Sequence, residues 1–165
     1  ERVLTVNGVS KCYAMTGWRV GYAAGPVELI RAMTTIQSQS TTNASSISQA
    51  AARAALMGDQ SFVAEACTIY KERHDFVIER LNQIPGFECR PGDGAFYAFP
   101  DVTGAIERRD VVDDTALCEI LMAEAGVALV PGAAFGAPGH LRLSFAADIE
   151  TLTTALRRIE EFMAP

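Results

Sequence analysis

Residues 7–22 read Asn-Gly-Val-Ser-Lys-Cys-Tyr-Ala-Met-Thr-Gly-Trp-Arg-Val-Gly-Tyr, and this stretch decides the fold of the chain. Lys11 comes shortly after a β-branched apolar run at 3–6, which predicts a lysine held at the end of a buried strand. A lysine amine whose charge is disfavoured by burial can form a Schiff base with an aldehyde. Arg19, further along the same stretch, can clamp a phosphate through its planar fork of donors. Pyridoxal 5'-phosphate carries both groups on one ring.

The order of residues in this stretch resembles the lysine segment of the aspartate aminotransferase family, the fold-type I pyridoxal-phosphate enzymes, and most of all its prokaryotic branch. Asn7-Gly8 precedes Lys11, Met15-Thr16-Gly17-Trp18-Arg19 follows it, and Gly21-Tyr22 completes the match. The resemblance implies an α/β fold, the C-terminal portion of a PLP-dependent transferase fold, with the edge of the large-domain sheet plus the small α/β domain. It covers only that C-terminal part, because the family's partner for the pyridine nitrogen and its glycine-rich phosphate loop lie upstream of the lysine.

The resemblance assigns a role to three residues of this stretch. Lys11 is implied as the catalytic residue, which holds the cofactor and moves a proton to and from the α-carbon of the substrate. Arg19 is implied as a cofactor-binding residue, at the phosphate. Ser10 is a further candidate for the phosphate, although the family more often has a serine where this chain has Gly8. Taken without the motif, Lys11 could be a surface lysine and Arg19 a member of an ordinary salt bridge.

A second segment, residues 130–145, contains a proline-glycine turn followed by an alternating strand with Arg142 in it. A guanidinium in an apolar strand is costly unless it meets an anion. In the resembled family the arginine at this position receives the α-carboxylate of the amino acid, which implies Arg142 as the substrate-binding residue. An internal salt bridge is the alternative. His140 is expected to point to the other face of the strand, and Phe135 is a candidate for lining the substrate pocket.

Two further segments are expected to be structural. The Gly94-Ala95-Phe96-Tyr97 segment matches a family segment near the substrate entrance and is interpreted mainly as packing and backbone geometry. His74 lies in a run of charged residues and is expected on a charged helix face, without a functional role.

Composition narrows the possible classes of function. The net charge of −6 and pI of about 4.9 disfavour nucleic-acid binding, because an acidic surface repels phosphate backbones. No apolar run approaches the roughly 20 residues that cross a bilayer, so no membrane partner is expected. The four scattered cysteines predict reduced, mostly buried thiols and a cytoplasmic protein. No cluster of histidine, cysteine or carboxylate has metal-ligand spacing.

Periodicity and turn residues predict the remaining elements and their division. Strands are expected at 3–6, 20–24, 87–90, 95–99, 127–130 and 141–145, and helices at 26–39, 47–57, 61–84, 113–124 and 148–163. Residues 1–75 are expected to be the C-terminal part of the large PLP-binding domain with the start of the interdomain helix. Residues 76–165 are expected to be the small C-terminal domain.

The resemblance implies a pyridoxal-phosphate-dependent aminotransferase that moves an amino group between an L-amino acid, aspartate first of all, and a 2-oxo acid, 2-oxoglutarate first of all. It also implies a homodimer, and a 165-residue piece that is inactive by itself. Two alternatives remain open at this point. One is a lyase or synthase on the same fold, and the other is a non-catalytic, aminotransferase-like sensor domain.

Overall fold

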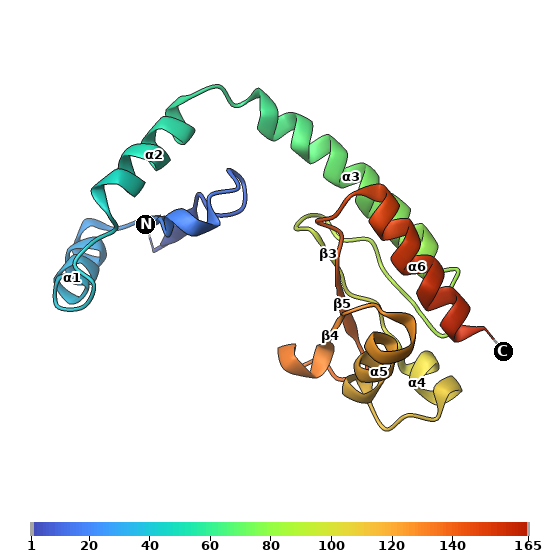
Figure 1. Cartoon of the computed structure of the whole chain (residues 1–165). Coiled ribbons are helices and arrows are strands. Elements are labelled where there is room, and N and C mark those ends of the chain that lie inside the picture. Colours follow the sequence, from blue (N-terminus) through green and yellow to red (C-terminus); the bar gives the residue numbers. More distant parts are fainter. Residues whose placement is uncertain (1, 165) are drawn as a thin grey trace. The chain divides into compact units, whose positions relative to one another are not determined.

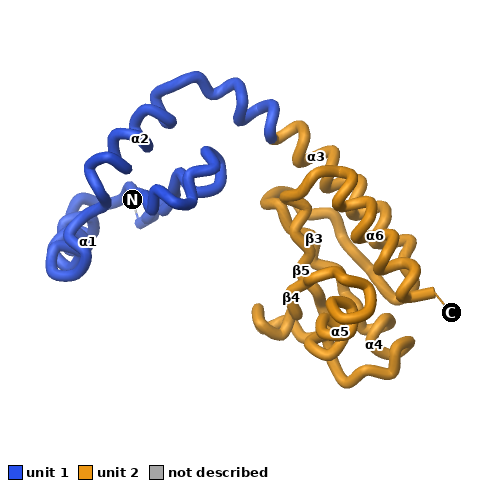
Figure 2. The backbone as a smooth tube through the Cα atoms, viewed as in Figure 1, with its two compact units in different colours: residues 1–66 blue, residues 67–165 orange. Residues whose placement is uncertain are grey.

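The computed structural model describes residues 2–164, so Glu1 and Pro165, the outer ends of the two predicted domains, lie outside the described residues. The chain forms two compact units, unit 1 (Glu1–Ala66) and unit 2 (Cys67–Pro165), shown in different colours in Figure 2. The division falls inside helix α3 (Ser61–Leu81), upstream of the predicted boundary between residues 75 and 76. The assignment of these regions to a large and a small domain stays a prediction.

Unit 1 consists of a two-stranded ribbon and two helices before α3. Strands β1 (Thr5–Gly8) and β2 (Gly21–Ala24) are antiparallel, and the 3-10 turn η1 (Thr16–Trp18) lies in the loop between them. Helices α1 (Val27–Ser38) and α2 (Ser46–Met57) follow, near their predicted positions. The buried core of this unit among the described residues consists of Val9, Met15 and Ala52.

A strand was predicted at 3–6 and expected to be buried, and the expected burial is wrong. The strand begins at Thr5, and the side chains of Val3 and Val6 are each 70% exposed. Burial depends on what covers the two faces of a strand, and β1 pairs with β2 alone among the described strands. The apolar stripe of α1 is similarly uncovered, since α1 contains no buried residue.

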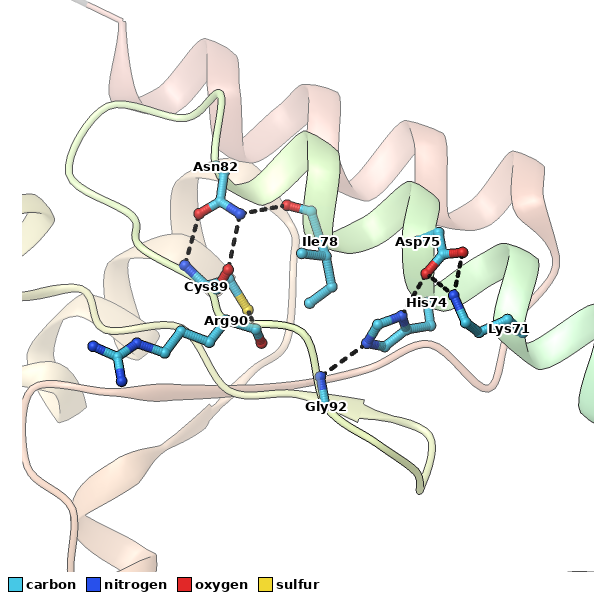
Figure 3. Close-up of polar contacts among 8 residues, drawn as sticks. All are labelled: Lys71, His74, Asp75, Ile78, Asn82, Cys89, Arg90 and Gly92. Atoms are coloured by element: carbon cyan, nitrogen blue, oxygen red, sulfur yellow. Dashed lines mark hydrogen bonds and ion pairs between the residues drawn. The ribbon is translucent and has the colours of Figure 1, made fainter.

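Helix α3 ends at Leu81, earlier than predicted, and the next backbone hydrogen bonds tighten: the Gln83 N–H donates to the Arg80 carbonyl, and the Ile84 N–H donates to the Leu81 carbonyl, both at 3.1 Å. The side chain of Asn82 then joins the end of the helix to the segment at Cys89. Its amide nitrogen donates to the carbonyls of Ile78 and Cys89, at 3.0 and 2.8 Å, and its oxygen accepts from the Cys89 N–H at 2.8 Å (Figure 3). An asparagine side chain that imitates the backbone in this way favours a turn over a further turn of helix.

Unit 2 is built on a three-stranded antiparallel sheet in the order β3-β5-β4. The strands are β3 (Tyr97–Ala98), β4 (Val130–Pro131) and β5 (Leu141–Ser144). In β5 the predicted alternation is confirmed, because Leu141 and Leu143 are buried and Arg142 and Ser144 are not. The strand predicted at 87–90 is wrong: only a single bridge, between Glu88 and Asp101, forms there.

Helices pack against this sheet and form the main core of the molecule. Helix α6 (Ile149–Met163) runs alongside the second half of α3 in Figure 1, and Arg80 and Glu160 form an ion pair between them, 2.8 Å apart. Helix α5 (Asp114–Ile120) continues into the π-helical turn η2 (Leu121–Ala125), close to the predicted range. Helix α4 (Thr103–Arg109) was not predicted. The buried residues of this core include Val77, Leu81, Phe87, Val102, Leu117, Leu121, Phe145, Leu152, Leu156 and Ile159.

Gly86 allows the chain to pass directly beneath α4. Its φ is +86°, in the left-handed region that favours glycine, and its carbonyl accepts a hydrogen bond from the Ala105 N–H at 3.1 Å. A Cβ at this position would lie 2.4 Å from the Ala105 nitrogen. The turn at the end of α3 therefore requires glycine both for its positive φ and for its close approach to α4, as its Pro-Gly sequence indicates.

Candidate active site

The lysine loop, defined as residues 9–20, connects β1 to β2 and carries three of the predicted site residues. Its backbone is folded on itself: the Tyr13 N–H donates to the Val9 carbonyl at 3.3 Å, and the Ala14 N–H donates to the Lys11 carbonyl at 3.2 Å. Ala14 and Arg19 both have positive φ, 51° and 55°. Non-glycine residues in this conformation are uncommon and occur often at functional sites.

Buried side chains anchor the lysine loop to α2. Val9 is completely buried and Met15 is 9% exposed, and both pack with Ala52 of α2. Tyr13 links the loop to the start of α3, because its hydroxyl donates to Gln60 Oε1 at 2.8 Å and its ring meets Phe62 of α3 edge-on at 5.8 Å. The loop is thus positioned by unit 1's own contacts.

The predicted cofactor residues lie on this anchored loop. Lys11 and Arg19 are exposed and Ser10 is half-buried, so the burial expected for the Lys11 amine is not found within unit 1. One guanidinium nitrogen of Arg19 donates to the Thr16 carbonyl at 3.1 Å, which engages one of the side chain's five donors. A primary amine, a guanidinium fork and a hydroxyl on one loop are a donor set that fits an aldehyde and a phosphate.

In unit 2, aromatic rings pack on Arg142. Its guanidinium carbon lies 4.6 Å from the ring centroid of Tyr97 and 4.6 Å from that of Phe135. Tyr97 pairs with Ser144, so it is the diagonal neighbour of Arg142 across the sheet. No carboxylate pairs with Arg142 among the ion pairs of the described residues. The arrangement is that of an oriented cation whose N–H edge can receive a carboxylate.

His140 lies on the same side as Arg142, contrary to the sequence-based expectation. Its ring stacks on Phe99 at 5.2 Å, Phe99 meets Phe135 edge-on at 6.2 Å, and Phe135 packs on Arg142. Residues two apart on an extended chain share a face, which is the rule that the expectation overlooked. Phe135 is 50% exposed at the edge of this cluster. Tyr97, interpreted from sequence as packing, is in direct contact with the candidate substrate arginine.

His74, predicted to lie on a charged helix face without a functional role, is buried on α3 and is 7% exposed. Its Nε2 accepts from the Gly92 N–H at 3.1 Å, and its Nδ1 lies 2.8 Å from Asp75 Oδ1 (Figure 3). Since Nε2 is an acceptor, the ring proton is on Nδ1 and is donated to Asp75. Hydrogen bonds from Lys71 and then from His74 lower the pKa of Asp75. His74 therefore connects α3 to the turn at Gly92, ahead of β3.

The four cysteines are free thiols, and half of them differ from the expected burial. Cys12 and Cys67 are exposed, whereas Cys89 and Cys118 are buried. Burial, with a smaller contribution from the Asp114 and Glu119 charges, raises the pKa of Cys118 to about 11. Among residues 2–164 no group of three or more histidine, cysteine or acidic side chains could hold a metal ion. Within the same range no helix has the length and apolar character of a membrane span.

The profile of one protein family, described as aminotransferase class I and II, matches residues 1–159 of the chain. The chain belongs to this family. An aspartate/prephenate aminotransferase of Cereibacter sphaeroides is 50% identical to this class I and II aminotransferase chain over 169 residues. An asparagine–oxo-acid transaminase of Streptococcus mutans is 46% identical over 163 residues. Each alignment covers 99% of this chain and 42% of the relative.

Solved structures give the same relationship for the aminotransferase fold. The crystal structure of the aspartate aminotransferase from Rhizobium meliloti superimposes with a TM-score of 0.90 at 48% identity, over 98% of this chain and 42% of that one. The aspartate aminotransferase from Thermotoga maritima gives a TM-score of 0.86 at 44% identity. The expected family and the expected α/β transferase fold are confirmed. The chain spans about 42% of the length of the curated relatives named above.

Proposed function

We propose that this chain is the C-terminal part of a pyridoxal-phosphate-dependent aminotransferase. The observation that carries the proposal is the anchored lysine loop, which presents Lys11 and Arg19 together in a chain that belongs to the class I and II aminotransferases. Arg142, a partly exposed cation packed on two aromatic rings, supports it from unit 2. The active enzyme is proposed to be longer than this chain and to work as a homodimer in the cytoplasm.

Each candidate residue has a task that its chemistry suits. Lys11 Nζ would hold the cofactor by its aldehyde and, once released, would move the proton between the substrate α-carbon and the cofactor's C4′ carbon. Arg19 and the Ser10 hydroxyl would bind the phosphate. Arg142 would bind and orient the substrate α-carboxylate. Bound pyridoxal phosphate supplies an electron sink for the charge that develops at the α-carbon.

The proposed substrates are aspartate and 2-oxoglutarate. The proposal draws on relatives named aspartate aminotransferase and aspartate/prephenate aminotransferase. One relative of similar sequence identity is named an asparagine–oxo-acid transaminase, so relatives at this level of identity are named for different amino donors. A panel of amino donors is therefore part of the test.

The test is an amino-transfer assay on the full-length protein, comparing the wild type with Lys11→Ala. We expect the wild type to form oxaloacetate and glutamate from aspartate and 2-oxoglutarate, and Lys11→Ala to lose nearly all turnover. Lys71, the other lysine of this chain, provides a matched control: it lies exposed on α3, and Lys71→Ala should keep its activity. Borohydride reduction followed by peptide mapping should attach the cofactor to Lys11.

Three outcomes would contradict the proposal. Attachment of the cofactor to a lysine other than Lys11 would refute the assignment of the site. Release of pyruvate, ammonia or a thiol without amino transfer would indicate a lyase or synthase. Bound cofactor without turnover on any amino donor would indicate a sensor module.

A further inference from the structure

Asp114 carries a buried carboxylate that the sequence does not explain. It is 1% exposed, at the first position of α5, and together with His74 it is one of two buried polar or charged side chains among the described residues. Capping does not account for it, because the N-cap of α5 is Asp113, whose Oδ1 accepts from the Ala116 N–H at 2.8 Å. A buried carboxylate is costly unless a donor meets it, so its partner indicates its role.

That partner is the backbone of the turn that carries Phe135. Asp114 Oδ2 accepts from the Ala133 N–H at 2.8 Å, at the start of the 3-10 turn η3 (Gly132–Phe135). The first N–H groups of a helical turn have no partner within the turn, and a carboxylate satisfies them well. The preceding residue is fixed as well, because the Gly132 N–H donates to the His140 carbonyl at 2.7 Å.

The turn is packed too tightly to shift without consequence. A Cβ on Gly132 would lie 2.3 Å from the Ala137 carbonyl oxygen and 2.8 Å from the Cβ of His140. The Ala137 N–H donates back to the Gly132 carbonyl at 3.0 Å. The position of Phe135, at the end of η3, therefore follows from the contacts at the start of the turn, one of which is the bond to Asp114.

Phe135 in turn contacts the candidate substrate arginine, since the guanidinium carbon of Arg142 lies 4.6 Å from its ring centroid. The ring restricts the orientations of a long and otherwise flexible side chain. A bidentate arginine–carboxylate pair depends on that orientation. The contacts form one continuous series, from the Asp114 carboxylate through the η3 backbone and the Phe135 ring to the Arg142 guanidinium.

We propose that Asp114 is a positioning residue for the carboxylate-binding site. By holding the start of η3, its carboxylate keeps Phe135 against Arg142, so that the guanidinium is oriented before a substrate carboxylate arrives. Asp114 itself does not touch the substrate. The inference rests on the proposed function of Arg142.

The experiment uses the full-length holoenzyme and compares Asp114→Ala with Asp113→Ala. Both changes remove an aspartate from the start of α5, but only the first removes the bond to η3. We expect Asp114→Ala to raise the KM for the amino acid and for the 2-oxo acid by roughly tenfold, the loss expected for one charge-assisted hydrogen bond, with kcat little changed. The dissociation constant of succinate, a carboxylate that cannot react, should rise in proportion in calorimetry. Asp113→Ala should leave these values within about twofold of the wild type.

Two further variants separate positioning from simple destabilisation. Asp114→Asn retains an oxygen that can accept from the Ala133 N–H, and it should restore most of the affinity for succinate. Phe135→Ala removes a half-exposed ring, which the core does not need, and should raise the same KM and dissociation constants. If Asp114→Ala fails to fold, Phe135→Ala and Asp114→Asn decide the matter: unchanged succinate binding in Phe135→Ala would overturn the inference.

Arg142→Ala distinguishes the failure of this inference from the failure of the proposed function. If Arg142→Ala weakens succinate binding and Asp114→Ala does not, the positioning role is wrong and the carboxylate site stands. If Arg142→Ala leaves binding of every carboxylate unchanged, the proposed site itself is wrong. An equal loss of affinity in Asp113→Ala and Asp114→Ala would reduce the effect to the stability of α5 and would also overturn the inference.

Discussion

Helix α6 in unit 2 buries Leu152, Leu156 and Ile159 along one face, whereas helix α1 in unit 1 has an apolar stripe but no buried residue. The difference extends through both units. The core of unit 2 draws on α3, α5, α6 and the sheet, while unit 1 buries Val9, Met15 and Ala52. Large apolar side chains of unit 1 that are at least 70% exposed are Val3, Val6, Ile36, Ile47 and Met57.

This comparison shows which of the candidate residues the chain can position by itself. Helices in proteins gain most of their stability from packing of an apolar face. Unit 2 supplies that packing internally, and the two rings that orient Arg142, Tyr97 and Phe135, both belong to unit 2. Exposed apolar stripes such as those of unit 1 are typical of surfaces that pack against further protein. The lysine loop is therefore the region that we expect to depend on more than this chain.

Expressing the two units separately should give the largest difference. We expect residues 67–165 to unfold cooperatively on heating, because their core is continuous, and residues 1–66 to show no cooperative transition. Circular dichroism and near-ultraviolet spectra of both fragments are the measurement. A sharp transition in the 1–66 fragment, with protected amides in α1, would contradict the comparison.

The next largest difference is expected between two side-chain truncations in the 165-residue chain, one at a buried residue and one at an exposed residue. Leu156→Ala, at a side chain that is 1% exposed in α6, should lower the free energy of unfolding by about 2–5 kcal/mol. Ile36→Ala, at a side chain that is 72% exposed in α1, should change it by less than about 0.5 kcal/mol. Urea unfolding measures both. If Ile36→Ala is costly in the full-length protein but not in this chain, the stripe of α1 is covered by the rest of the enzyme.

The smallest expected effect is on the stability of unit 2 at alkaline pH. The pKa of Cys118 is raised from 9.0 to about 11 by burial, so the thiol ionises in the unfolded state before it does in the folded state. The stability that the buried, protonated Cys118 thiol contributes is complete below pH 9 and is lost as the pH rises to about 11. Cys118→Ala should flatten this part of the stability–pH curve, with Cys67→Ala, at an exposed cysteine, as the control. Identical alkaline slopes in wild type and Cys118→Ala would contradict the prediction.

Some elements could be predicted because the deciding residues are local. α6 begins where Asp148 accepts from the Thr151 N–H, and its apolar period continues to Met163. The lysine motif identified the family, and the comparisons confirm it. Helix α4 was missed because Thr103–Arg109 is short and largely charged or small, and its start depends on Asp101, whose side chain accepts from the Thr103 N–H.

The candidate site could be predicted only as a set of residues, and their assignment as site residues stays a prediction. Lys11, Arg19, Ser10 and Arg142 follow from motifs, but the ring of Tyr97 reaches Arg142 through a strand register that spacing in the sequence does not specify. The roles of His74 and Asp114 were missed for a similar reason. His74 accepts from the Gly92 N–H and Asp114 accepts from the Ala133 N–H, both distant in the sequence. Local periodicity does not predict such contacts.

The chain contains one tryptophan, Trp18, and it lies at the end of η1 inside the lysine loop. It is 44% exposed, directly before Arg19. Its fluorescence is consequently a built-in optical label for the lysine loop, because unit 2 contains no tryptophan. Emission excited at the red edge of the absorption band would follow the lysine loop by itself. A change in that emission would report on unit 1 within the intact chain, with no dye attached.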